Sequence, residues 1–232
     1  ILLVGPAGCG KTYLGELVAK SLGLDFGSLS CTAGMSENHL LGRGVPNITK
    51  GNNVFQGTRF LELYEEGGLF LLDELDSADP NLLLSINSAI ANRYCNVPNR
   101  PSEPRAEQHP DFVLIATANT FGRGATRVYA GRNQLDEATL DRFRIGTVEC
   151  DYDPIVEASV CPDDELRSYL TGIRAKVAET GLRRVISTRF MIDAYQMKTG
   201  VNWDMSKIKK VLYLGWGKDE IRKVDYEYAS TV

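Results

Sequence analysis

Near the start of the chain stands the stretch Gly5-Pro6-Ala7-Gly8-Cys9-Gly10-Lys11-Thr12, or GPAGCGKT in one-letter code. An apolar run, 1–4, precedes it, and apolar residues at helical spacing follow it as far as Gly23. A run that is apolar at every position is typical of a parallel strand buried on both faces, so the unit is predicted to be strand, turn and helix. Glycines let backbone N–H groups turn inward around phosphate oxygens, and the helix adds its positive N-terminal end. The stretch therefore predicts a phosphate-binding loop, in which Lys11 reaches the β- and γ-phosphates and Thr12 offers its hydroxyl to Mg²⁺.

Two further apolar runs, 69–72 and 112–116, end in polar residues, which are Asp73-Glu74 after the first and Thr117-Ala118-Asn119 after the second. In open parallel sheets, ligands bind beyond the carboxyl ends of the strands, so we expect these side chains to lie near the phosphate loop. Asp73 is expected to hold Mg²⁺ through its water shell, and Glu74 to orient or deprotonate the water that attacks the γ-phosphate. Asn119 is expected to hold that water or to sense the γ-phosphate, unless it merely forms a turn, and the strand order decides between these roles.

Helical patterns alternate with the apolar runs. Asp79-Pro80 predicts a helix start, with apolar residues on one face as far as Ile90. The proline-rich segment 99–110 is predicted to be an exposed loop. Alternating strands and helices predict an α/β fold with a doubly wound parallel sheet of the P-loop NTPase kind.

The pattern changes near residues 151–153, beyond which no apolar strand run follows. Helix starts are predicted at Asp163 and at Ser187, each with apolar residues at helical spacing behind it. We therefore expect two domains, an α/β nucleotide-binding core over 1–153 and a small all-helical lid domain over 154–232.

Composition narrows the class of protein. The formal net charge of −4 argues against a broad nucleic-acid footprint, and 43% hydrophobic residues allow a sizeable core. The five cysteines are odd in number and widely spaced, which fits a reducing compartment and a cytoplasmic protein better than a disulfide framework or a zinc site.

No apolar run approaches the ~18–20 residues of a membrane span, so we expect no membrane association. Because the first residue is Ile1 instead of Met, we expect a truncated N-terminus.

Five segments, in the order of the family, resemble motifs of the AAA+ ATPases. They are GPAGCGKT (Walker A), LFLLDELD (Walker B), IATANT (sensor 1), DEATLDRF (arginine-finger region) and ISTRF (sensor 2). Residues 34–74 resemble the corresponding stretch of MoxR-type and dynein-related members, in which an insert interrupts the second helix. Residues 122–143 are similar to a segment of the ATPase subunit of cobaltochelatase.

The resemblance implies roles for several arginines. Arg142 takes the place of the arginine finger, which would reach the ATP of a neighbouring subunit, with Arg144 and Arg132 as alternatives. Arg189 takes the place of sensor 2 and would link the lid to the γ-phosphate. Thr188 departs from the proline that MoxR-type proteins usually carry before this arginine, and the alternative is an arginine that is simply exposed at a helix start.

The resemblance further implies ATP and Mg²⁺ as cofactors and a homo-oligomer, commonly a hexameric ring. The insert 34–57 would be a mobile loop that touches the client protein, and the segment 93–100 would form the hairpin typical of the group. A partner with a von Willebrand A domain, or a chelatase partner, is expected. Family members carry residues ahead of the first strand that help to clasp the adenine. The nucleotide-binding set implied is Gly5, Pro6, Ala7, Gly8, Cys9, Gly10, Lys11, Thr12, Tyr13 and Asp73, with Thr12 and Asp73 also at the metal.

Two other functions remain open at this stage. The first is a nucleic-acid-associated AAA+ motor, favoured by small basic groups at 93–105 and 207–210 and opposed by the acidic balance. The second is a small-molecule kinase built on the same phosphate loop, which the sensor and finger motifs argue against. The preferred function is a MoxR- or cobaltochelatase-like ATPase that remodels or assembles a partner protein.

Overall fold

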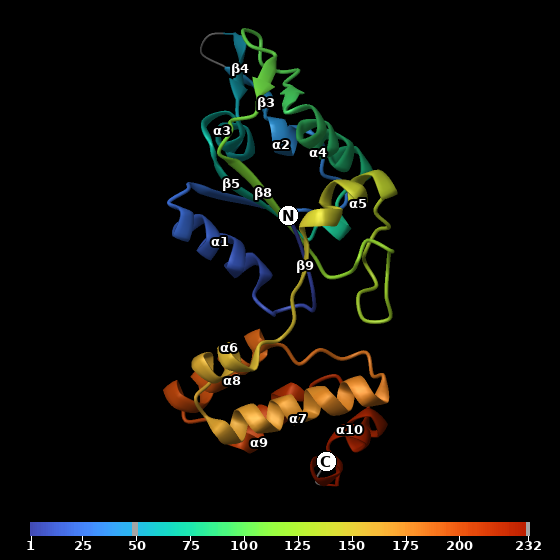
Figure 1. The fold of residues 1–232 in the computed structure, drawn as a ribbon. Helices are drawn as coiled ribbons and strands as arrows, with labels where there is room; N and C mark the ends of the chain where they lie inside the picture. The colour runs from blue at the N-terminus through green and yellow to red at the C-terminus, as the bar shows by residue number, and fades with distance from the viewer. Residues whose placement is uncertain (48–50, 231–232) are drawn as a thin grey trace. The chain divides into compact units, whose positions relative to one another are not determined.

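The structure, a computed structural model, describes residues 1–47 and 51–230 as two compact units (Figure 1). The first unit contains Ile1–Gly5 and Lys11–Cys150, and the second contains Pro6–Gly10 and the chain from Asp151 onward. The division thus falls three residues before the predicted boundary at 153, and it groups five residues of the phosphate loop with the second unit.

A five-stranded parallel sheet forms the centre of the first unit. Its strands, in spatial order, are β2 (Phe26–Ser30), β5 (Gly68–Asp73), β8 (Phe112–Ala118), β1 (Leu2–Val4) and β9 (Thr147–Glu149). The three predicted apolar runs are β1, β5 and β8, and they lie side by side at the middle of the sheet. Register pairs Leu3 with Thr117 and Leu72 with Ala116, so the polar residues behind these strands meet at one edge.

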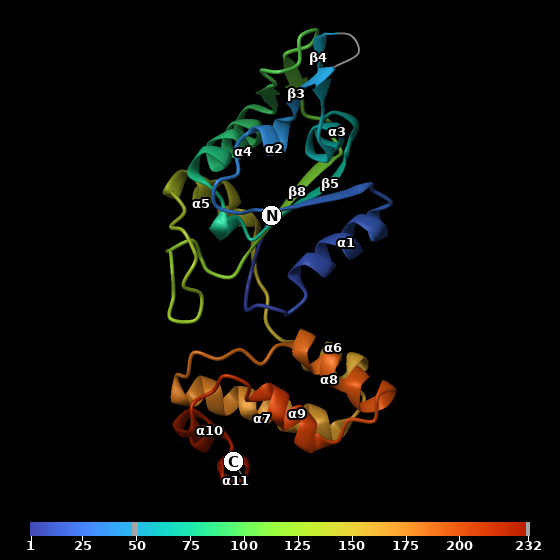
Figure 2. The ribbon, with the colours of Figure 1, turned by 180° about the vertical axis from the view of Figure 1, so that it is seen from behind.

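Helices cover both faces of this sheet (Figures 1 and 2). Successive side chains of a strand point to opposite faces, so a strand that is apolar at every position presents apolar side chains to helices on both sides. Leu3 and Leu71 pack with Ala19 of α1 (Lys11–Leu22) on one face. Leu2 and Leu72 belong to the larger core on the other face, which holds α3 (Arg59–Glu66), α4 (Pro80–Asn92) and α5 (Glu137–Phe143). The predicted α/β doubly wound fold is confirmed.

The insert contains more regular structure than the sequence predicts. A short helix, α2 (Asn38–Leu41), buries Leu40 and Leu41 in the core. It leads into an antiparallel pair, β3 (Arg43–Asn47) and β4 (Asn52–Gln56). The prediction of a loop throughout 34–57 is therefore wrong for these segments, and residues 48–50 of the insert lie outside the described part of the chain.

A second antiparallel pair precedes β8, as the family resemblance implies. It consists of β6 (Tyr94–Asn96) and β7 (Arg105–Glu107), so the hairpin extends beyond the predicted 93–100. The prediction of an exposed loop over the whole of 99–110 is wrong at β7, because Ala106 is fully buried against the core. Arg100 fixes the connecting turn through a bidentate ion pair with Glu65, at 2.8 and 2.9 Å.

The described part of the second unit beyond Asp151 is helical, as predicted. Its helices are α6 (Pro154–Val160), α7 (Asp164–Thr180), α8 (Thr188–Gly200), α9 (Met205–Leu212), α10 (Lys218–Val224) and α11 (Tyr226–Ala229). The predicted caps are confirmed, because the side chains of Asp163 and Ser187 accept from the backbone N–H groups of Leu166 and Phe190. Its core is separate and includes Leu166, Leu170, Met191 and Ile208. Among the described residues, no helix combines the length and the apolar character that crossing a membrane requires.

Candidate nucleotide site

The phosphate loop has the backbone that its glycines predict. Gly10 has φ of 97°, a value that residues with a Cβ rarely adopt. Gly5 lies where the chain passes the carbonyl oxygen of Cys150, and a Cβ there would come within 2.1 Å of that oxygen. Glycine is therefore required at one position by conformation and at the other by close approach.

Lys11, the first residue of α1, is only 8% exposed. Its ammonium group donates to the carbonyl oxygen of Gly5 at 2.8 Å and to Oδ1 of Asn119 at 3.0 Å. The strand order β5-β8-β1 thus places Asn119 beside Lys11. These two contacts hold the ammonium group of Lys11 at the carboxyl edge of the sheet.

The two predicted metal residues are neighbours. The hydroxyl of Thr12 donates to Oδ2 of Asp73 at 3.1 Å, although 61 positions separate them in the chain. Oδ1 of Asp73 accepts from the hydroxyl of Thr117, a buried residue of β8. Both carboxylate oxygens of Asp73 are therefore oriented by hydroxyl groups, one from α1 and one from β8.

Glu74 follows Asp73 in the left-handed region, with φ of 57° and ψ of 45°. Its backbone N–H donates to the hydroxyl of Thr117 at 3.1 Å. Its side chain is 43% exposed, and Oε1 accepts from Nη2 of Arg132 at 2.9 Å. A non-glycine residue at positive φ costs about 1–3 kcal/mol and is frequent at functional sites, which supports the special role predicted for Glu74.

Asp76 lies in the short 3₁₀ turn η1 (Leu75–Ser77) directly behind Glu74 and is fully buried. Its Oδ2 accepts from the backbone N–H groups of Asn119 and Thr120, at 3.1 and 3.0 Å, and from the Thr120 hydroxyl at 2.9 Å. A buried carboxylate that accepts several such bonds fixes the backbone to which it is bound. Asp76 thereby ties the turn after β5 to the end of β8 and sets the position of Asn119.

The acidic residues create a negative field at this edge of the sheet. Burial, together with the carboxylates of Asp73, Glu74 and Asp76, raises the pKa of the nearby Cys31 thiol to about 12. Cys31 is therefore a neutral thiol at physiological pH, and the field favours a cation. Oxygen ligands from hydroxyl and carboxylate groups are those that Mg²⁺ prefers.

The candidate finger arginines differ in their surroundings. Arg142 is exposed on α5, where its Nη1 donates to the carbonyl oxygen of Ala138 at 2.5 Å. Arg144 lies directly after α5, in the 3₁₀ turn η2 (Arg144–Gly146), where it is exposed and pairs with Glu137 and Asp141 of α5, at 3.3 and 3.5 Å. Arg132, by contrast, is 13% exposed and pairs with Glu74 of its own chain. The structure therefore brings Arg132 to the site and leaves Arg142 exposed on α5 and Arg144 exposed directly after that helix.

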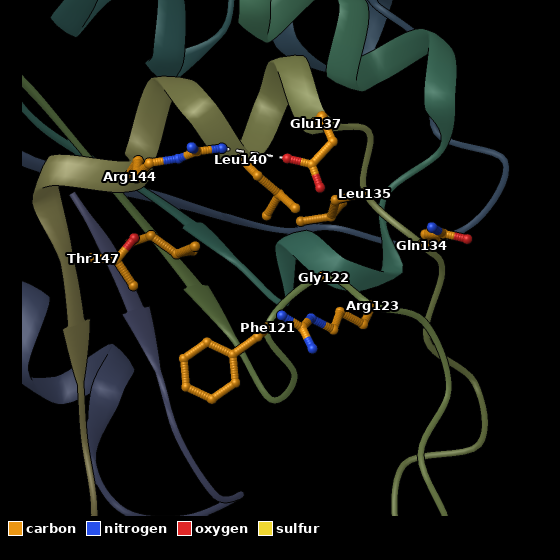
Figure 3. Close-up of a pocket in the computed structure, with 10 residues that line it drawn as sticks. Phe121, Gly122, Arg123, Gln134, Leu135, Glu137, Leu140, Arg144 and Thr147 are labelled. Atoms are coloured by element: carbon orange, nitrogen blue, oxygen red, sulfur yellow. Dashed lines mark hydrogen bonds and ion pairs between the residues drawn. The ribbon is translucent and has the colours of Figure 1, made fainter.

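A pocket of about 580 Å³ opens beside α5 and the start of β9 (Figure 3). Phe121 and Arg123 lie on one side of it, and the Glu137–Arg144 pair lies on the other. Of the residues predicted for the nucleotide site, only the alternative finger Arg144 lines it. The pocket is thus distinct from the cluster around Lys11 and Asp73.

The remaining predicted residues are described within their own units, and in the second unit a Cβ added at Gly8 would lie 3.4 Å from the Cβ of Arg189. Tyr13 is exposed on α1, and Cys9 is partly buried in the loop. Arg189 is exposed in the first turn of α8 in the second unit. Within that unit, the hydroxyl of Tyr152 donates to the carbonyl oxygen of Ala7 at 2.9 Å, a contact that constrains the backbone of the loop.

Sequence reasoning did not assign Thr117, Asp76 or the contact between Arg132 and Glu74. A local signal existed for the first two. Thr117 is a polar residue inside the apolar run of β8, and Asp76 is a third acid behind β5. Arg132 and Glu74 are 58 positions apart in the chain, so no local sequence pattern predicts their contact.

Comparison with known families decides the classification of the chain. The profile of the AAA domain, dynein-related subfamily, matches residues 1–143. The chain belongs to this family of AAA+ ATPases. The match ends at Phe143, so it covers the loop, the acidic pair and Asn119 as well as the helix that carries Arg142.

Relatives in this AAA group include very large proteins. Midasin of Dictyostelium discoideum is 32% identical over 171 residues, which are 73% of this chain and 3% of that protein. Midasin of Giardia intestinalis is 31% identical over 62% of this chain and 3% of its own length. An uncharacterized protein of Staphylococcus epidermidis is 28% identical over 66% of this chain, and the match spans 55% of that protein. The chain thus spans about half or less of the curated relatives described here.

A solved structure shares the fold. The crystal structure of a proposed ATPase from Cytophaga hutchinsonii superposes with a TM-score of 0.50 at 18% identity, covering 91% of this chain and 74% of that one. At this identity the likeness shows the fold alone, which agrees with the doubly wound sheet and the helices that follow it.

Proposed function

We propose that the chain binds ATP and hydrolyses it to ADP and phosphate with the help of Mg²⁺. One observation carries this proposal, namely that Lys11, Thr12, Asp73, Glu74 and Asn119 all gather at one edge of the sheet. These residues follow three different strands, with Lys11 in contact with Asn119 and Thr12 in contact with Asp73. They supply a cation for phosphate oxygens, oxygen ligands for a metal, and a carboxylate for water.

The residues fit the two cofactors chemically. The glycine backbone and the N-terminus of α1 offer N–H groups to phosphate, and Lys11 adds a buried positive charge. Thr12 and Asp73 would hold Mg²⁺, which neutralises charge on the β- and γ-phosphates when it is bound. Glu74 would accept the proton of the attacking water, and Asn119 would fix the position of that water. Positioning and electrostatic stabilisation supply most of the catalysis in phosphoryl transfer.

The finer function we propose is that of a MoxR- or cobaltochelatase-like remodelling ATPase. In this proposal, a ring of subunits, commonly six, places Arg142 against the nucleotide of the next subunit. The exposed position of Arg142, apart from its own acidic cluster, supports an action in trans. Arg189 would respond to the γ-phosphate from the lid, and the β3–β4 segment of the insert would contact the client. A protein with a von Willebrand A domain or a chelatase partner is the partner class that the resemblance implies.

Mixing two inactive variants tests the finger and the ring together. Arg142→Ala subunits keep a complete acidic pair, and Glu74→Gln subunits keep a complete finger. We expect each variant alone to lose most Mg²⁺-dependent phosphate release, because a finger is worth about 10³–10⁵ in rate in other NTPases. A mixture is expected to recover part of the wild-type rate, since some sites combine a good Glu74 with a good Arg142.

The control for this experiment is Arg144→Ala mixed with Glu74→Gln subunits. Arg144 pairs with Glu137 and Asp141 of the preceding helix α5, so its removal alone is expected to change the rate little. No recovery in the Arg142 mixture, with co-assembly verified by light scattering or native mass spectrometry, contradicts a finger in trans.

The alternative of a nucleic-acid motor is weakened by the pairing of two of the basic residues on which it rests. Arg100 is bound to Glu65, and Arg105 pairs with Glu107 at 2.6 Å and stacks over Tyr94 at 3.8 Å. Paired charges release fewer counterions from a phosphate backbone than free ones do.

ATP hydrolysis is therefore expected to change less than twofold when single-stranded DNA, duplex DNA or RNA is added at ~100 mM salt. The measurement is steady-state phosphate release with and without each nucleic acid. A tenfold stimulation that disappears as salt rises would favour the motor instead.

A further inference from the structure

Arg132 makes an unusual set of contacts for a residue in a loop between β8 and α5. Its Nη2 donates to Oε1 of Glu74 at 2.9 Å, and its Nη1 donates to the hydroxyl of Ser77. Nη1 also lies 3.5 Å from Oδ1 of Asp76. The guanidinium thus spans Glu74, Asp76 and Ser77, which are the residues immediately behind β5, and its side chain is 13% exposed.

The contact with Asp76 meets a specific electrostatic need. Oδ2 of Asp76 accepts three hydrogen bonds, whereas Oδ1 is buried and accepts none in the described part of the chain. A buried carboxylate that lacks a nearby cation is destabilising by several kcal/mol. The guanidinium of Arg132 lies next to this oxygen and compensates its negative charge. This electrostatic attraction stabilises the position of the Arg132 side chain.

The backbone around Arg132 is also anchored. The N–H of Asn133 donates to the carbonyl oxygen of Asp76 at 2.7 Å, and its side-chain amide donates to the carbonyl oxygen of Ala78 at 3.1 Å. Leu135 is buried, and its N–H donates to the carbonyl oxygen of Gly122 at 2.9 Å. A guanidinium on such a base has little freedom to leave Glu74, and the hydrogen bond to Glu74 raises the pKa of Arg132 further.

Glu74 is consequently held at two points. Thr117 holds its backbone N–H, and Arg132 holds Oε1 of its carboxylate. A charge-assisted hydrogen bond from a guanidinium restrains the position of the carboxylate oxygen that accepts it. With Oε1 engaged, the second oxygen, Oε2, is the acceptor that the orientation leaves for a water molecule.

From this geometry we propose that Arg132 is a positioning residue that aims the Glu74 carboxylate at the attacking water, acting within its own subunit. The inference rests on the proposed function, because it requires that Glu74 handles that water. It also assigns Arg132 a different place from Arg142: Arg132 acts through Glu74 and does not contact the nucleotide of a neighbouring subunit. The carboxylate of Asp76 contacts both Arg132 and the backbone N–H of Asn119, so this one buried group helps to position both residues.

The test measures kcat and KM for ATP, and the affinity for a non-hydrolysable ATP analogue, in variants of the full chain. Arg132→Ala is expected to lower kcat about 10- to 100-fold, since a misplacement of about 1 Å can cost ~100-fold in rate. KM and the analogue affinity are expected to stay within about twofold. Arg132→Lys is expected to recover part of the loss, because a lysine keeps the charge but cannot span Glu74 and Asp76 together. Arg127→Ala is the matched control, an exposed arginine of the same loop that is expected to leave kcat unchanged.

A double variant separates positioning from a general effect on the fold. Because a glutamine accepts no proton, its position no longer governs proton transfer. Adding Arg132→Ala to Glu74→Gln is therefore expected to change the residual rate less than twofold, whereas a structural defect would lower it again. If Arg132→Ala lowers the melting temperature strongly, kcat and KM are measured in the double variant Asp76→Asn/Arg132→Ala. The second substitution removes the buried charge that Arg132→Ala leaves without a cation, so this protein is expected to fold.

Several outcomes overturn the inference. An unchanged or raised kcat in a folded Arg132→Ala variant does so, and a raised kcat would mean that Arg132 restrains Glu74. A raised KM with unchanged kcat would assign Arg132 to nucleotide binding, and recovery on mixing with Glu74→Gln subunits would place its action in trans. If Glu74→Gln itself turns over normally, the proposed role of Glu74 fails first. If Glu74→Gln is inactive and Arg132→Ala is normal, only the inference about Arg132 fails.

Discussion

Replacing Lys11 with alanine is expected to reduce ATP binding below detection at micromolar nucleotide. Lys11 is 8% exposed, and its ammonium group lies at the carboxyl edge of the sheet, where it already donates to Gly5 and Asn119. Removal of one member of a buried, hydrogen-bonded charge pair costs about 2–5 kcal/mol, which is roughly 30- to 5,000-fold in affinity. Isothermal titration calorimetry with a non-hydrolysable ATP analogue measures this loss directly.

The matched control is Lys20→Ala. Lys20 lies in the last turn of the same helix and is exposed, so its removal changes the charge of the chain equally. We expect its nucleotide affinity to stay within about twofold of the wild type. Unchanged affinity in a folded Lys11→Ala variant, checked by circular dichroism, would remove the phosphate-loop assignment.

Glu74→Gln is expected to separate binding from turnover. Glutamine keeps the shape of the side chain and can still accept from Arg132 through its amide oxygen, so the turn behind β5 is retained. It cannot take a proton from water, and positioned general acid–base groups contribute about 10²–10⁴ in rate. We expect a fall in kcat of that size, with the affinity for the ATP analogue within about threefold of the wild type.

Single-turnover phosphate release with excess enzyme isolates this chemical step from product release. Glu66→Gln, at the exposed end of α3, supplies the control for a lost carboxylate outside the site. Hydrolysis at more than half of the wild-type rate in Glu74→Gln would exclude Glu74 as the residue that activates water.

Together these variants divide the site by chemistry. We expect the Lys11 variant to lose nucleotide binding, the Glu74 and Arg132 variants to lose turnover, and the Arg142 mixtures to show whether a second subunit takes part. Loss of binding, loss of kcat alone, and recovery on mixing are separate readouts. A failure of one assignment therefore leaves the others open to test.

Much of the fold follows from local sequence patterns. The runs 1–4, 69–72 and 112–116 are apolar at every position because β1, β5 and β8 occupy the middle of the sheet and are covered on both faces. The edge strands β2 and β9 carry no such run, because an edge strand buries less of its side-chain surface. Sequence reasoning accordingly missed both. The β3–β4 pair left no local pattern for a related reason, since short antiparallel pairs are held mainly by backbone bonds that any residues supply, and the β6–β7 pair was expected only from the family resemblance.

The sequence by itself determined that a phosphate loop, an acidic pair and a polar sensor would follow three buried strands. It could do so because a buried parallel strand and a helix N-terminus each leave a local pattern, and the carboxyl ends of parallel strands share one edge. Only the tertiary structure decided which side chains touch. Thr117 orients Asp73, Asp76 holds the backbone of Asn119, and Arg132 pairs with Glu74 across 58 positions. These contacts depend on the strand order and on the path of the long loop that carries Arg132. A buried carboxylate pairs with the cation that lies nearest to it in space. The spacing of residues along the chain does not reveal which cation that is.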